Sequence, residues 1–291
     1  MRRALPVLLL LLSTLTVWTQ EIVVSDLEGS PILITSDGSE PLREGDTIPP
    51  AGRLSLGEES RVTLREGSRE IQLFRRGLYG ISELFTFRPL GKVDFEQLFE
   101  ARIKSVNLAL KDGEGAGEEA LLTNTAVETA SEELPLLREG VRALVTGRYS
   151  EARDSFTTYL GESEGEEEDQ VAQVARVLAA QSAFFLDENA EAYELLSETM
   201  PSPGHSHFPI YLLLRAQLLI ESHAFADALE TLAEYLSEPP GGDADLQTAR
   251  LLTGVAYEGL GNLPVARTYY RRATSPDPSS AVAKAARRLL E

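Results

Sequence analysis

The stretch GVAYEGLGNLPVARTYYRRATSPDP, residues 254–278, decides the fold of the C-terminal half. It has a glycine at 254, an alanine twelve residues later at 266 and a tyrosine four residues after that at 270. Three earlier stretches have the same order of small residue, alanine and large apolar residue: Gly140, Ala152 and Phe156; Ala180, Ala192 and Leu196; Ala216, Ala228 and Leu232. Their starts are 40, 36 and 38 residues apart. This period predicts stacked units of two helices, because antiparallel helices approach closely only where small residues lie at the crossing.

The last unit resembles a tetratricopeptide repeat (TPR). The positions that carry the resemblance are Gly254, Tyr257, Gly261, Ala266, Tyr270, Ala273 and Pro278. The first unit keeps a turn glycine at Gly147, the third has His223 there, and the second is degenerate, with Asp187-Glu188-Asn189 at its turn. The resemblance implies an all-α, TPR-like solenoid of about four helix pairs over residues 134–291, closed by a capping helix over Ala281–Leu290.

Residues 21–90 predict a small all-β domain. Short β-branched or alternating runs, such as Ile22-Val23-Val24 and Val62-Thr63-Leu64, are separated by turn signals about every ten residues. The stretch PLREGDTI, residues 41–48, resembles the hallmark of FecR-type periplasmic domains, with Gly45-Asp46 as a tight turn in which Asp46 caps its own backbone. The predicted fold class is therefore α+β multidomain, a β domain followed by a helical solenoid, and the resemblance implies a cell-envelope setting.

Two further segments complete the domain organisation. Residues 1–20 join a basic start, Met1-Arg2-Arg3, to a run of fourteen mostly apolar residues at Ala4–Val17, which is typical of a signal peptide. We expect export to the periplasm; an uncleaved N-terminal anchor is the alternative. Residues 91–133 predict a helical segment followed by a flexible linker from 112 onward, with residual β pairing as the alternative for that linker.

Composition excludes several function classes. The chain of 291 residues has 27 basic and 46 acidic residues, a net charge of −19, and loss of Arg2 and Arg3 with the signal makes this −21. Such a charge argues against nucleic acid and against anionic lipid surfaces, which recruit clustered Lys and Arg. Cysteine is absent, so disulfides, thiolate catalysis and Cys-ligated zinc are excluded. No later stretch is long and apolar enough to predict membrane insertion after signal cleavage.

The search for catalytic or metal-binding residues finds little. His205 and His207 flank Ser206 in a Pro/Gly-rich loop, but no further ligand at a fixed spacing supports a metal site. The acidic run at 162–169 lacks the ligand ladder of a calcium loop and is typical of a solvated loop, with weak cation binding or a basic partner as the alternatives. We therefore predict no enzyme activity, no cofactor and no metal.

The predicted binding site is the groove of the solenoid. By resemblance, the first helix of each pair lines the concave face, and the groove-facing positions are Val141, Leu144, Gln181, Phe184, Gln217, Ile220, Val255 and Glu258. Each of these residues has an alternative role in packing between helices.

The leading hypothesis is an exported cell-envelope scaffold or adaptor that binds a protein or peptide partner through this groove. The alternative is an envelope-glycan-binding or assembly factor in which the β domain binds the ligand and the repeats act as a spacer. Four aromatic residues would then stack on sugars, or else form the β core: Phe74, Tyr79, Phe85 and Phe87.

Overall fold

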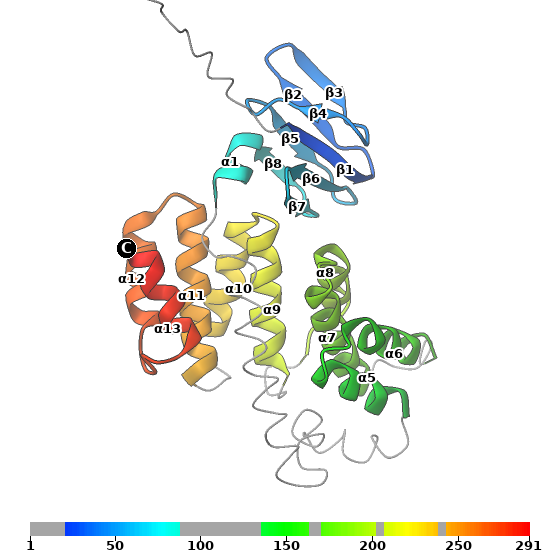
Figure 1. The fold of residues 1–291 in the computed structure, drawn as a ribbon, viewed down its shortest axis with the longest axis vertical. Helices are drawn as coiled ribbons and strands as arrows, with labels where there is room; N and C mark the ends of the chain where they lie inside the picture. The colour runs from blue at the N-terminus through cyan, green and yellow to red at the C-terminus, as the bar shows by residue number, and fades with distance from the viewer. Residues whose placement is uncertain (1–20, 88–134, 163–169, 202–206, 238–242) are drawn as a thin grey trace, which may run out of the picture.

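The computed structural model describes residues 21–87, 135–162, 170–201, 207–237 and 243–291, and Figure 1 shows their arrangement. Within these residues an N-terminal region of two antiparallel β-sheets precedes a C-terminal region of helices. The signal peptide, the helix and linker over 91–133 and most of the acidic run at 162–169 lie outside the described residues. Those assignments stay predictions.

The β region consists of two four-stranded sheets. One has the order β4-β1-β6-β7, formed by Thr47–Ile48, Ile22–Glu28, Arg61–Glu66 and Arg69–Leu73. The other has the order β3-β2-β5-β8, formed by Gly38–Pro41, Ile32–Thr35, Arg53–Leu56 and Gly77–Gly80, and a short helix α1 (Ile81–Thr86) follows. Apolar residues from both sheets and α1 share one core. The β structure predicted from the alternating runs is therefore present as a region of two antiparallel sheets.

The turn predicted at Gly45-Asp46 is also present. Gly45 has φ +84°, a conformation that favours glycine, and the Arg43 backbone N–H donates to Asp46 Oδ2 at 2.8 Å. The Gly45 N–H donates in turn to the Val24 carbonyl at 2.9 Å. The loop before β4 is thereby fixed to the centre of β1.

The helical region contains consecutive antiparallel pairs. Within the described residues these are α5 (Pro135–Val145) with α6 (Tyr149–Glu162), α7 (Gln170–Phe185) with α8 (Asn189–Ser197), α9 (Phe208–Glu221) with α10 (Phe225–Ser237), and α11 (Asp243–Gly259) with α12 (Leu263–Ala273). A last helix, α13 (Ala281–Leu290), packs on α12 and α11. The first helices of successive pairs also contact one another, α5 with α7, α7 with α9 and α9 with α11.

The small residues lie where the sequence pattern predicts helix crossings. A Cβ added to Gly140 would lie 2.7 Å from the Phe156 ring, and one added to Gly254 would lie 2.5 Å from the Tyr270 ring. The alanines at the second repeated position, Ala152, Ala192, Ala228 and Ala266, are all fully buried. Close approach of the two helices in each pair therefore depends on the absence of a larger side chain.

The turns between the paired helices repeat at the same spacing. The second residue after each first helix has a positive φ: 75° at Gly147, 73° at Asp187, 58° at His223 and 75° at Gly261. In each turn the next N–H donates to a carbonyl five residues earlier, as Arg148 does to Ala143 at 2.8 Å and Glu188 to Ala183 at 3.0 Å. This is the bond that closes a helix ending in a left-handed residue. The degenerate second unit therefore has the register predicted for it.

No helix within the described residues is both long and apolar enough to cross a membrane.

Candidate functional site

The connection between β7 and β8 holds the β region against the helices. The Phe74 ring lies 5.0 Å from the Tyr193 ring of α8, and its side chain belongs to the core of the helical region, where it is 8% exposed. Arg75, the next residue, donates from Nε and Nη2 to Asp227 Oδ2 of α10 at 3.1 and 2.6 Å. The two adjacent side chains thus reach two different helix pairs.

Arg75 is itself held in place from the β side. The Tyr79 hydroxyl donates to the Arg75 carbonyl at 2.7 Å, and burial raises the pKa of Tyr79 to about 12. Burial lowers the pKa of Arg75, but the hydrogen bond and charge of Asp227 outweigh it, so that the pKa is raised overall. Both groups therefore keep their protons, and their contacts are structural at any physiological pH.

Further contacts join the β region to the end of the helical region where the two helices of a pair are connected. Figure 1 shows the sheets lying next to this end of the helices. The Gln72 amide donates to the Asp187 carbonyl at 3.0 Å, and Arg61 pairs with Glu194 at 2.7 Å. The Phe87 ring, directly after α1, lies 4.7 Å from the Phe225 ring and 5.6 Å from the His223 ring. We call the contact surface between the β region and the helices the junction. The left-handed turn residues of the second and third helix pairs, Asp187 and His223, are part of it.

A cleft opens where β8 and α1 meet the helices. Its volume is about 340 Å³, and it is lined by Arg76–Gly80, by residues of α1, by the turn and first residues of α10, and by Gly259 and Leu260 at the end of α11. Leu78 and Leu260 are 55% and 52% exposed, so two large apolar side chains face solvent in the same cleft. The lining is mixed, with about as much polar as apolar surface, and a concave surface of this kind is suited to binding.

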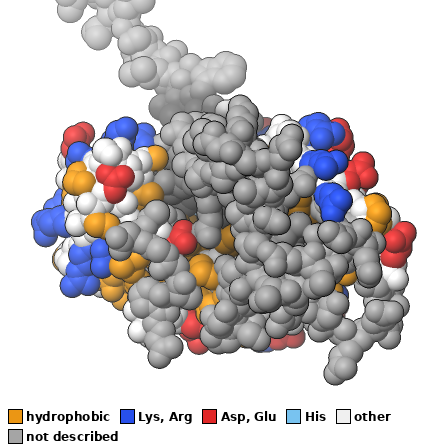
Figure 2. Space-filling view, turned by 90° about the horizontal axis from the view of Figure 1, so that it is seen from below, with side chains coloured by type: hydrophobic (Ala, Val, Ile, Leu, Met, Phe, Trp, Pro, Cys, Tyr) orange, Lys and Arg blue, Asp and Glu red, His pale blue; other side chains and the backbone are white. Residues whose placement is uncertain are grey.

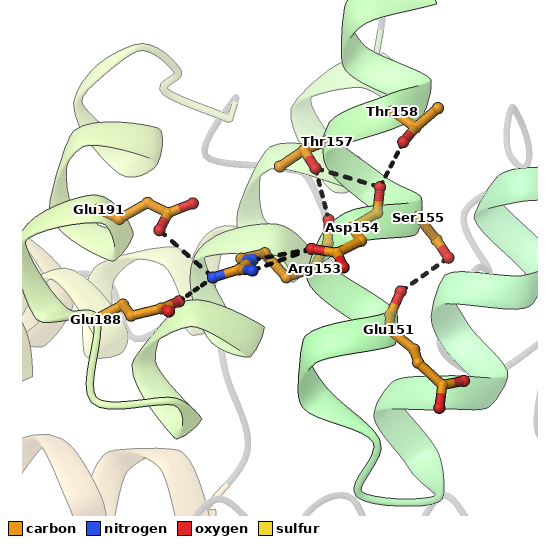
Figure 3. A network of polar contacts seen from close by, with 8 residues as sticks. All are labelled: Glu151, Arg153, Asp154, Ser155, Thr157, Thr158, Glu188 and Glu191. Atoms are coloured by element: carbon orange, nitrogen blue, oxygen red, sulfur yellow. Dashed lines mark hydrogen bonds and ion pairs between the residues drawn. The ribbon is translucent and has the colours of Figure 1, made fainter.

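The first and second helix pairs are joined by a network around Arg153 of α6 (Figure 3). Its guanidinium pairs with Glu188 in the turn before α8, with Asp154 at 3.0 Å and with Glu191 at 3.7 Å. The hydrogen bond to Glu188 raises the pKa of Arg153, and burial raises the pKa of Glu191. The hydroxyls of Thr157 and Thr158 donate to backbone carbonyls of the same helix, and the guanidinium at the centre of the network links the first helix pair to the second.

Figure 2 shows basic side chains on the side of the molecule where α12 and α13 lie. The exposed positions of these two helices carry six basic side chains, Arg267, Arg271, Arg272, Lys284, Arg287 and Arg288. This end of the molecule is therefore basic in a chain whose net charge is −19.

The predicted groove residues lie on the first helices α5, α7, α9 and α11, as expected, but most are enclosed. Seven of them, Val141, Leu144, Gln181, Phe184, Gln217, Ile220 and Val255, are at most 4% exposed. Glu258 is partly exposed and accepts a hydrogen bond from the Tyr270 hydroxyl at 2.5 Å. Gln217 is fully buried, and among the residues that the structure describes neither polar atom of its amide has a hydrogen-bond partner. In this structure the seven buried residues take the alternative role, packing between helices, and their part in binding stays a prediction.

The four aromatic residues of the glycan hypothesis are also mostly enclosed. Phe74, Tyr79 and Phe85 are at most 9% exposed. Phe87 is partly exposed and packs edge-on against Phe225. Three of the four rings therefore present no open face on which a sugar could stack in this arrangement.

The histidines are dispersed. His205 lies outside the described residues, and His207 is buried directly before α9. Burial, together with the charge of Arg69, lowers the pKa of His223 to about 4. In the part of the chain that the structure describes, no three or more His, Asp or Glu side chains are grouped as a metal site requires.

Sequence analysis missed the junction as a site. Its one signal is Phe74-Arg75-Arg76, a large apolar residue and two arginines between two strands, where a short polar turn is usual. No family model, curated protein or solved structure matches the chain, so the TPR and FecR resemblances rest on the residues quoted for them.

Proposed function

We propose that this protein is an exported cell-envelope scaffold or adaptor, without enzyme activity, whose helical region is a TPR-like solenoid that binds a protein partner. The observation that supports this most is the recurrence of one turn geometry at Gly147, Asp187, His223 and Gly261. Identical turns, each preceding a helix packed through a small residue, are the features from which solenoids build an extended binding surface.

The position of the β region is a second observation in favour of a scaffold function. Its contacts with α8 and α10, through Phe74 and Arg75, occupy the edge of the helical region formed by the inter-helix turns. Within the described residues, the β region leaves the opposite edge and the faces of the helix pairs uncovered. An adaptor needs such a division, because one part must hold the other in a fixed orientation while a separate surface binds.

The site of partner binding is tested by photo-crosslinking. A photoreactive amino acid at Glu258, the partly exposed member of the predicted groove, should give one discrete adduct in intact bacterial cells. The same amino acid at Arg267, exposed on α12, should give no adduct of that mass. Equal adducts from both positions, or none from Glu258, would count against the groove.

Export is tested separately by the N-terminus of the native protein. We expect it near Gln20 or Glu21, in the periplasmic fraction, because residues 1–19 have the pattern of a signal peptide. Recovery of a soluble cytoplasmic protein that retains Met1 would contradict the envelope setting.

A further inference from the structure

Each β-sheet has two outer strands, and three of the four are protected against pairing. β7 carries Arg69 and Glu70 and contacts α8. β3 is fully exposed but carries Glu40 and ends at Pro41, and β4 is only two residues long. Charge, proline, coverage and shortness are the usual means by which proteins prevent another chain from adding to a sheet edge.

β8 differs from these three. Its sequence, Gly77-Leu78-Tyr79-Gly80, has no charge and no proline, and among the described strands it pairs with β5 alone. Tyr79 is directed into the core, whereas Leu78 is 55% exposed. The strand therefore presents an uncharged backbone edge with an apolar side chain beside it.

The cleft described above lies along this edge. All four residues of β8 and Arg76 directly before it line the cleft. Leu78 and Tyr79 are consecutive strand residues, so their side chains point to opposite faces of the sheet, and a cavity that both border adjoins the strand's edge. Across the cleft, Leu260 at the end of α11 is 52% exposed and supplies an apolar wall.

We propose that this edge is a binding site for an extended, apolar peptide segment of a partner protein, which adds to the sheet as a strand beside β8. The partner's backbone pairs with the edge of β8 on which no described strand lies, and one of its side chains lies between Leu78 and Leu260. Main-chain hydrogen bonds supply affinity in this mode of recognition, and pockets for alternate side chains supply specificity. A volume of about 340 Å³ is suited to a few side chains and not to a folded domain. None of the predicted groove residues lines this cleft, so its failure would leave the proposed function standing.

The test uses the full chain and a phage-displayed library of random peptides. Selection against the wild-type protein, with counter-selection against Leu78→Lys, should enrich peptides with alternating apolar residues. Lysine at position 78 places a charge at the edge without disturbing the core, because the side chain is exposed. Ile32→Lys is the matched control: Ile32 is 42% exposed, but its strand β2 is paired on both sides, with β3 and β5.

Synthetic copies of an enriched peptide then separate backbone pairing from apolar contact. Methylation of alternate backbone nitrogens removes donors and leaves every side chain intact. We expect fluorescence anisotropy to show binding at least about tenfold weaker for the methylated peptide and for Leu78→Lys, and unchanged for Ile32→Lys. Hydrogen exchange should slow at residues 76–80 when the peptide binds. Equal binding of the methylated peptide, equal loss in Ile32→Lys, or a selection that enriches no peptide would overturn the proposal.

Discussion

At the scale of single residues, the four inter-helix turns adopt one conformation with three different residue types. Glycine occupies two of them, Asp187 a third and His223 a fourth, with φ values between 58° and 75°. Aspartate and histidine are among the few residues other than glycine that adopt this conformation with any frequency. At positions 187 and 223 the side chain therefore costs strain. At position 223 the side chain also gives the β region a surface to contact, because the Phe87 ring packs against the His223 ring.

His223 makes the stability of the protein depend on pH. Burial and Arg69 lower its pKa to about 4 in the folded protein, against about 6.5 in an unfolded chain. Between these values the unfolded state binds more protons, so the free energy of unfolding falls as the pH falls from 7 toward 4. We expect this residue to cost about 1–2 kcal/mol at pH 5 relative to pH 7.

Urea unfolding at pH 7 and pH 5 checks this expectation. The variant His223→Asn removes the titrating group and keeps a residue that tolerates a positive φ. It should lose less stability between the two pH values than the wild type does. If both proteins lose the same amount, His223 titrates normally and is not enclosed at the junction.

The same substitution at two glycines should have opposite effects. Gly254→Ala would place a Cβ 2.5 Å from the Tyr270 ring, which is 1% exposed and cannot move aside, so we expect a loss of about 1–3 kcal/mol. Gly161→Ala, near the end of α6, meets nothing within 4 Å and should be neutral or stabilise by up to about 1 kcal/mol. Chemical denaturation of the two variants side by side measures the difference. A tolerated alanine at 254 would mean that α11 and α12 do not cross there.

At the scale of elements, α13 closes the helical region. Its N-terminal Ser280 accepts a hydrogen bond from the Ala283 N–H at 3.0 Å and donates to Gln247 Oε1 of α11 at 3.0 Å. Gln247 is buried and donates to the Ala273 and Asp277 carbonyls at 2.7 and 2.9 Å. One buried amide thus ties α11 to the end of α12 and to the turn before α13.

Loss of the apolar face of α13 should weaken its neighbours and spare the β region. Val282 is 6% exposed, and Val282→Asn should cost about 1–3 kcal/mol because it removes apolar burial and encloses an amide. Lys284→Asn, on the exposed face of the same helix, should change stability by less than about 0.5 kcal/mol. Hydrogen exchange of Val282→Asn should quicken in α11–α13 and remain unchanged in β1–β8, since repeats couple mainly to their neighbours. Faster exchange throughout the chain would mean that the two regions unfold together.

At the scale of the whole molecule, the junction should hold the β and helical regions together without a covalent link. A specific protease site introduced within residues 112–133 would cut the chain between them. We expect the two pieces to co-elute in gel filtration, because Phe74 is enclosed by the helical core and Arg75 pairs with Asp227. High salt should weaken this association only slightly, since both members of that ion pair are more than a third exposed and such pairs contribute at most about 1 kcal/mol.

A substitution at Phe74 tests whether its ring holds the two pieces together. Phe74→Ala should separate the cut pieces, because the loss of an enclosed phenylalanine costs on the order of 3 kcal/mol. Ile32→Ala removes an exposed apolar side chain from the same region and should leave the pieces together. Separation of the wild-type pieces immediately after cleavage would show that the covalent link, and not the junction, keeps the regions adjacent.

The sequence by itself determined the local structure. The spacing of Gly254, Ala266 and Tyr270 predicts the helix pairs, alternation predicts the strands, and the final helix was expected over Ala281–Leu290, the bounds that it has. These features follow from interactions between residues close in the chain, where backbone geometry fixes which side chains meet. The turn at Gly45-Asp46 belongs to the same group, since the bond from the Arg43 N–H to Asp46 Oδ2 that closes it spans three residues.

Only the tertiary structure decided which surfaces are enclosed. Arg75 and Asp227 are 152 residues apart, and Gln72 and Asp187 are 115 apart, so no local period could connect them. From the sequence, Phe74 was expected in the β core or as a platform for a sugar, whereas in the fold it belongs to the core of the helical region. The buried groove residues are a similar case, because a position on the first helix of a pair faces either a ligand or the next helix, depending on how closely neighbouring pairs approach. The distance between neighbouring helix pairs depends on how their whole surfaces pack together, and it cannot be read from the periodicity of the sequence.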